Sequence, residues 1–127
     1  MRIDHIAYRV ANRHDAVEFF HTTLGYTIVD EFEIKFDDGS SADCFVLSPP
    51  EANLLISRVK NYGNYHLAPE IFVSDGSKGS IVYKWVQERG GVGGIHHMAY
   101  EVASVEETME EWKKKGYAEF TTEEPMS

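Results

Sequence analysis

The sequence has 127 residues, 43% of them hydrophobic and 13% aromatic, and this length suits a single domain with its own core. The 21 acidic and 12 basic residues give a formal net charge of −9, which argues against nucleic acid or an anionic membrane as the main partner. A single cysteine, Cys44, cannot form an internal disulfide, and no apolar run is long enough for a signal peptide or membrane span. We therefore expect a soluble protein of the reducing cytoplasm.

The chain opens with a stretch that recurs near its end. Residues 3–10 and 95–102 match at five of eight positions at an offset of 92, far more than two unrelated stretches would share. The same offset relates later positions that suit a helix cap and a helix face: Asn12 and Ser104, Asp15 and Glu107, Val17 and Met109, Phe20 and Trp112. We interpret this as an internal duplication, in which His5 and His97 occupy equivalent places.

The first repeat predicts one helix and several strands in the order βαβββ. Residues 3–10 alternate as a strand, and its more apolar face should meet the helix that follows. Asn12 suits the N-cap of that helix and Gly25 its end. The remaining elements of this repeat are strands at 26–36, 42–47 and 70–73, a turn at 37–41, and a segment at 51–68 that we interpret as a loop.

A connector leads to the second repeat. Residues 81–89 predict a short helix with Ile81, Trp85 and Val82 as the inward candidates. The glycines of 90–94 precede a strand instead of a helix, so a hinge is favoured over a phosphate-binding loop. The second repeat then predicts a strand at 95–102, a helix at 105–115 with Ser104 and Glu107 as a capping box, and a strand at 117–121.

The candidate site lies where the two repeated strands would meet. If the repeats pair about a twofold axis, the faces of these strands opposite their helices line one concavity: His5, Ala7 and Arg9 from the first, His97, Ala99 and Glu101 from the second. Imidazole suits zinc, iron, nickel or cobalt, and a carboxylate extends the range to manganese. Glu70, on a strand of the first repeat, is the best third ligand, so the predicted metal ligands are His5, Glu70 and His97.

An ordinary interpretation of these residues stands beside the metal site. A strand histidine is commonly a hydrogen-bonded polar residue, and Glu70 alone suits an exposed strand carboxylate. His96 alternates to the helix side, which favours a histidine that is hydrogen-bonded in the core or supports a ligand. Cys44 suits a small buried hydrophobe better than a nucleophile.

With these motifs the sequence resembles the vicinal oxygen chelate superfamily of glyoxalases, bleomycin resistance proteins and ring-cleaving dioxygenases. Residues 3–8, and residues 84–100 with their His96-His97 pair, are most similar to the methylmalonyl-CoA epimerase family. The resemblance implies an α+β fold of paired βαβββ modules in one domain: module one at 1–74, a connector at 75–94, and module two at 95–127, truncated to βαβ. It also implies His5, Glu70 and His97 as ligands of a divalent metal.

The sequence departs from the family in two places. The family's fourth ligand is a glutamate on the final strand of module two, and the sequence reaches Ser127 before such a strand. The family's candidate base aligns with Cys44, beside Asp43, whose side chain should point the other way, so no catalytic base is assigned. An unfinished sheet leaves an edge for pairing, and a homodimer is therefore the expected assembly.

The expected function is that of a metal-dependent isomerase or lyase. By the resemblance, a divalent metal (Co, Mn, Ni, Zn or Fe) would hold two substrate oxygens and stabilise an enolate while a base moves a proton, on an acyl-CoA thioester or an α-keto compound. Two alternatives remain open. One is a metal-free small-molecule binding protein of the bleomycin-resistance type. The other is an iron-dependent dioxygenase, although the order His, Glu, His differs from the order in dioxygenases, whose carboxylate comes last.

Overall fold

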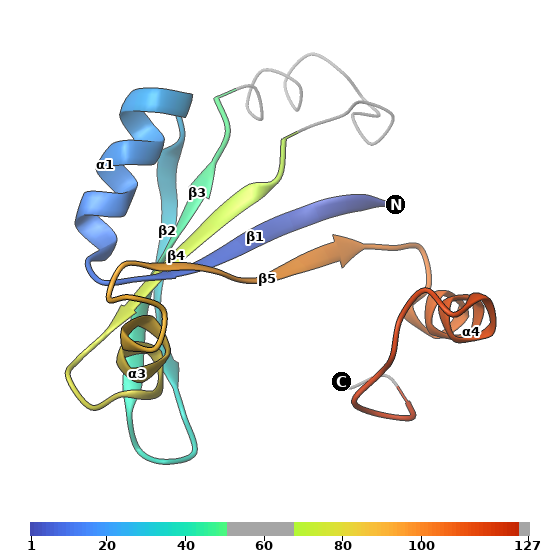
Figure 1. Cartoon of the computed structure of the whole chain (residues 1–127). Helices are drawn as coiled ribbons and strands as arrows, with labels where there is room; N and C mark the ends of the chain where they lie inside the picture. Colours follow the sequence, from blue (N-terminus) through green and yellow to red (C-terminus); the bar gives the residue numbers. More distant parts are fainter. Residues whose placement is uncertain (51–67, 125–127) are drawn as a thin grey trace.

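The computed structural model describes residues 1–50 and 68–124, which form one five-stranded sheet and three helices (Figure 1). The sheet has the strand order β2-β3-β4-β1-β5. The predicted α+β class is confirmed. The elements in chain order are β1 (Arg2–Val10), α1 (Arg13–Leu24), β2 (Thr27–Lys35), β3 (Ser41–Ser48), β4 (Glu70–Gly76), α3 (Ile81–Gln87), β5 (Gly93–Glu101) and α4 (Val105–Lys115).

The pairing of the strands brings the two sequence repeats together at β1. This strand is parallel to β4, with His5 opposite Glu70, and antiparallel to β5, with Ala7 opposite His97. β3 runs antiparallel to both β2 and β4. The first repeat thus supplies four contiguous strands, and β5 of the second repeat forms the edge beyond β1.

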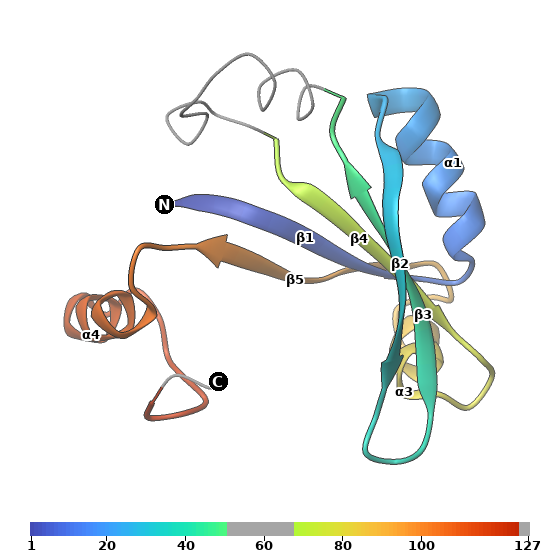
Figure 2. The same cartoon turned by 180° about the vertical axis from the view of Figure 1, so that it is seen from behind.

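One face of the sheet packs against α1 and forms the core (Figure 2). Its buried members are Phe20, Tyr26, Phe45, Leu47, Ile71 and Val73, with Tyr8, Val10, Ala16 and Val17 partly buried around them. These residues follow the alternation of the strands and the three-to-four spacing of the helix, as predicted. The other face of β1 is left to the histidine-bearing positions.

Both repeats build the same local unit of strand, cap and helix. The side chain of Asn12 accepts a hydrogen bond from the backbone N–H of Asp15 (3.1 Å), and the Ser104 hydroxyl accepts one from the N–H of Glu107 (3.2 Å). The glycine after each helix has a φ of 72°, a left-handed conformation that glycine adopts without strain. The predicted caps are confirmed.

Equivalent aromatic pairs then join each strand to its helix. The rings of Tyr8 and Phe20 lie 5.1 Å apart in the first repeat, and those of Tyr100 and Trp112 lie 5.7 Å apart in the second. These four residues are related by the offset of 92 that the sequence shows. The duplication is therefore visible in side-chain contacts as well as in backbone order.

The orientation of α3 differs from the prediction. Val82 and Val86 are its buried residues, whereas Ile81 is 37% exposed and Trp85 is half-buried. The helix packs across β1, β4 and β5 at the end of the sheet where β1 finishes (Figure 1). Gly93 lets the backbone after α3 pass close to the end of β1, because a Cβ at this position would collide with the carbonyl oxygen of Arg9.

The predicted strand at 117–121 is wrong, because these residues form bends and irregular structure. A strand needs a neighbour to satisfy its backbone groups, and Tyr117 is 70% exposed here instead of lying beside one.

α4 stands beyond the end of β5, away from α1, in both views (Figures 1 and 2). The predicted loop at 51–68 falls outside the described residues up to position 67. No described helix combines the length and apolarity that a membrane crossing requires.

Candidate functional site

The two equivalent histidines meet on the sheet face opposite α1. His5 and Ala7 share this face, and the register places Glu70 beside His5 and His97 beside Ala7. The rings of His5 and His97 lie 5.5 Å apart at an interplanar angle of 80°. Two of the three predicted ligands are therefore neighbours in space, and the third stands next to them across β1 and β4.

The ring of His5 is fixed by two contacts. Its Nδ1 lies 2.9 Å from Oδ2 of Asp4, and its plane stacks on Phe72 at 4.0 Å and 3°. A carboxylate at Nδ1 favours the tautomer that carries its proton there, which leaves Nε2 as the atom for a metal. The side chain is 16% exposed, so this orientation is held in a largely desolvated place.

An irregularity in β5 sets the position of His97. Ala7 pairs with His97 but Tyr8 pairs with Ile95, so His96 is an extra residue, as in a β-bulge. The Nδ1 atoms of His96 and His97 form a hydrogen bond of 2.9 Å, in which one ring donates and the other accepts. His96 is exposed and does not lie in the core, and its hydrogen bond to His97 agrees with the other expectation, a histidine that supports its neighbour.

Partial burial and nearby positive charges lower the pKa values of both rings of this pair. Partial burial lowers the pKa of His97, and the nearby His5 and Arg9 lower it further. Burial also lowers the pKa of His96, followed by the charges of Arg9, His97 and Arg89. A lowered pKa favours the neutral imidazole, which is the form in which a histidine binds a metal.

Glu70 shares the face but is engaged elsewhere. Its Oε2 accepts a hydrogen bond of 2.9 Å from the hydroxyl of Ser48 on β3. Across residues 1–50 and 68–124, no three histidine, cysteine or acidic side chains are gathered closely enough to hold a metal ion. Imidazole and carboxylate are donors of the kind that divalent metals bind, but in this structure the carboxylate of Glu70 is hydrogen-bonded to Ser48.

The position of the family's candidate base is occupied by a thiol that is unsuited to that role. Cys44 faces the histidine side of the sheet through its pairing with Ser74. It is buried, and burial raises the pKa of its thiol to about 11. The neighbouring Asp43 lies on the other face, where its carboxylate is 3.7 Å from Arg13.

Asp4 was missed by the sequence reasoning. Alternation along β1 places its side chain on the face away from His5, and a hydrogen bond between adjacent residues leaves no periodic signal. The acidic residue directly before the histidine was the only hint.

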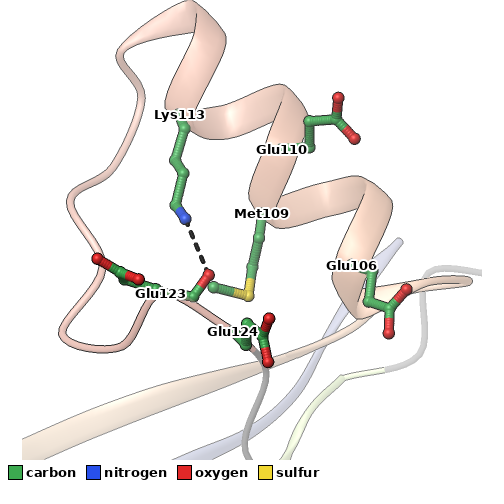
Figure 3. Close-up of a pocket in the computed structure, with 6 residues that line it drawn as sticks. All are labelled: Glu106, Met109, Glu110, Lys113, Glu123 and Glu124. Carbon is green, nitrogen blue, oxygen red and sulfur yellow. Dashed lines mark hydrogen bonds between the residues drawn. The ribbon is translucent and has the colours of Figure 1, made fainter.

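A separate hollow of about 440 Å³ lies against α4 (Figure 3). It is lined by Glu106, Met109, Glu110, Lys113, Glu123 and Glu124. The ammonium of Lys113 donates a hydrogen bond of 3.2 Å to the backbone carbonyl of Glu123, which joins the helix to the residues after it. None of the predicted metal ligands lines this hollow, and we do not assign it to the chemistry of the histidine face.

Several solved structures resemble this fold. A methylmalonyl-CoA epimerase of Streptomyces coelicolor, in complex with 2-nitronate-propionyl-CoA, has a TM-score of 0.60 and 21% identity, and the match covers 99% of this chain and 79% of that one. Another methylmalonyl-CoA epimerase has a TM-score of 0.60 at 19% identity, over 91% and 71% of the two chains. The enzyme from Mycobacterium tuberculosis has a TM-score of 0.58 at 23% identity, over 91% and 64%.

Comparison of sequences gives the family. No curated protein matches the chain significantly. The profile of the glyoxalase/bleomycin resistance protein/dioxygenase superfamily matches residues 4–126, a span that contains all three predicted ligands and all but the first residue of the two repeats. The chain belongs to the glyoxalase/bleomycin resistance protein/dioxygenase superfamily.

Proposed function

We propose that this protein is a metal-dependent isomerase or lyase that moves a proton next to a carbonyl group. The observation that carries the proposal is the meeting of His5 and His97, the equivalent histidines of the two repeats, on one face of the sheet. The epimerases of similar fold support an acyl-CoA thioester as the substrate, with an α-keto compound as the other candidate.

The proposed metal ligands are His5, Glu70 and His97. When bound, a divalent ion such as Co, Mn, Ni, Zn or Fe supplies Lewis-acid polarisation of a substrate carbonyl. Asp4 holds the proton of His5 at Nδ1, and His96 orients His97 in the same way. Glu70 completes the set once it releases the hydroxyl of Ser48.

Metal binding is the first test. Purified protein, stripped with chelator and dialysed, is titrated with Co²⁺ and Mn²⁺ by calorimetry, and metal content is checked by elemental analysis. We expect one equivalent to bind, with affinity reduced about tenfold or more in His97→Ala, because loss of a ligand removes a coordinate bond. His14→Ala is the matched control, since this histidine is exposed on α1 and contacts Phe45 instead. Equal binding by His97→Ala and the unmodified protein would overturn the metal site.

The reaction is tested by solvent exchange. The metal-loaded protein is incubated with methylmalonyl-CoA in D₂O. We expect deuterium at the α-carbon, because the base that removes the α-proton exchanges it with the solvent. The dioxygenase alternative, which also uses two histidines and a carboxylate, is tested with a catechol as substrate. Oxygen uptake with the catechol, without deuterium exchange on the thioester, would indicate this alternative. Exchange no faster than the background rate, with metal bound, would exclude this thioester as substrate.

A metal-free binding protein of the bleomycin-resistance type is the second candidate. It is favoured by the hydrogen bond of Glu70 to Ser48 and by the buried thiol of Cys44 at the position of the family's base. Absence of metal binding in calorimetry, together with saturable binding of a small-molecule ligand, would support it over the enzyme.

We also propose a homodimer in the cytoplasm. β5 is an edge strand of the sheet, and Ile95, Met98 and Tyr100 are each about half exposed along it. An open edge with apolar side chains favours pairing with a second copy. Light scattering of the eluted protein at several concentrations tests this, and a monomer throughout would contradict it. The single cysteine is the argument for the reducing compartment.

A further inference from the structure

Two arginines flank one tryptophan at the end of the histidine face. The guanidinium of Arg89 lies 4.0 Å from the centre of the Trp85 ring, and that of Arg9 lies 5.8 Å from it. Arg9 is on β1, on the same face as His5, whereas Trp85 is on α3 and Arg89 follows that helix. The ring of Trp85 also meets His96 edge-on at 5.4 Å, so the cluster continues into the histidine pair.

This cluster carries positive charge with little to balance it. No ion pair or hydrogen bond of the Arg9 guanidinium is found within the described part of the chain. Arg89 has an ion pair of 3.6 Å with Glu88, whose side chain is 73% exposed, and such exposed pairs contribute little. Burial lowers the pKa of Arg9, and the charge of Arg89 lowers it further, which is the effect of two cations held close together.

Other arginines of the described chain are paired with carboxylates. Arg2, on the same strand as Arg9, lies 3.4 Å from both Asp4 and Glu101. Arg13 lies 3.0 Å from Asp75. In a protein of net charge −9, acidic partners are plentiful, and a partly buried arginine without one is therefore an exception that a ligand would explain.

We propose that Arg9, Arg89 and Trp85 form a binding site for an oxyanion, a carboxylate or phosphate group of a small molecule that lies over the histidine face. Guanidinium groups bind such oxygens through paired hydrogen bonds. Trp85 holds the two arginines by cation–π contact and so limits the entropy that they lose on binding. Arg9 lies four residues after His5 on β1, about 13 Å away along the strand, so a ligand that reaches His5 from this site is extended.

Anion binding is tested without metal, so that the result does not depend on the proposed metal-dependent activity. Inorganic phosphate and malonate are titrated at constant ionic strength into chelator-treated protein, and the indole N–H signals are followed by NMR. Of the two tryptophans, Trp112 is on α4, and a Trp112→Phe variant assigns its signal. We expect saturable shifts of the Trp85 signal. Stronger binding of phosphate identifies a phosphate ester as the ligand group, and stronger binding of malonate identifies a carboxylate.

Charge-removing variants decide whether the arginines are responsible. Arg9→Gln and Arg89→Gln are each expected to weaken anion binding about tenfold or more, the loss of one charged hydrogen-bonding partner. Arg89 is exposed, so its variant keeps the test usable if Arg9→Gln fails to fold. Lys84→Gln is the matched control, because it removes one positive charge from the exposed side of the same helix. No saturable binding of either anion, or equal weakening by all three variants, would overturn the proposal.

Discussion

The two repeats have the same local structure and very different packing. In the first, Phe20 is 7% exposed, because α1 covers a face built by four strands. In the second, Tyr100 is 47% exposed, and Met109 is the one buried residue in the described α4. Caps and aromatic pairs are thus encoded within each repeat, whereas burial depends on the strands that surround it. The difference shows that the repeated sequence is sufficient to specify the strand, cap and helix, whereas the stability of this unit depends on the elements that pack around it.

Truncating the equivalent aromatic residues tests this contrast most directly. We expect Phe20→Ala to lower the free energy of unfolding by about 3–5 kcal/mol, because it leaves a cavity in the core. Trp112→Ala should lower it by about 1 kcal/mol or less, since the partner ring of Trp112 is already half exposed. Urea unfolding followed by far-UV circular dichroism measures both. Equal losses would mean that the second repeat is packed as firmly as the first.

The buried thiol of Cys44 gives the first repeat a stability that depends on pH. Burial raises its pKa from 9.0 to about 11, so the folded state retains a proton that the unfolded chain loses above pH 9. The thiol therefore leaves the free energy of unfolding unchanged below pH 9. It lowers that free energy as pH rises from 9 towards 11, by on the order of 2 kcal/mol. Urea unfolding at pH 8 and pH 10.5 measures the fall. The variant Cys44→Ala should lose less over the same interval, and an identical loss would assign the effect to other groups.

Much of the fold could be predicted because its determinants are local. Alternation in residues 3–10 and the Asn12 and Ser104 caps describe interactions between residues close in sequence, and the offset of 92 relates two copies of the same local unit. α3 was harder, because its seven residues include four apolar ones and a period cannot be fixed over two turns. The strand at 117–121 was wrong because β propensity is expressed only beside a partner strand.

The site was predicted in part for the same reason. His5 and His97 could be placed on one face by symmetry, and their contact agrees with that placement. Their roles as ligands, with Glu70, stay a prediction. Strict alternation could not foresee the extra residue at His96, because a bulge depends on the pairing of two distant strands. Nor could it place Trp85 beside Arg9, a contact between elements that only tertiary structure brings together.

Removing the two N-caps gives a smaller effect that sharpens the comparison. Asn12→Ala should lower the free energy of unfolding by about 1 kcal/mol, the usual cost of an unsatisfied first turn. Ser104→Ala removes the same interaction from α4, but this helix packs little against the sheet, so the loss should appear as local fraying.

Hydrogen exchange separates the two outcomes. We expect Asn12→Ala to speed exchange in the slowest amides of β1 and β4 through global unfolding. We expect Ser104→Ala to speed exchange only within α4, while the urea midpoint stays unchanged. If Ser104→Ala also accelerated exchange in β1, α4 and the sheet would unfold as one cooperative unit, and the contrast between the repeats would be lost.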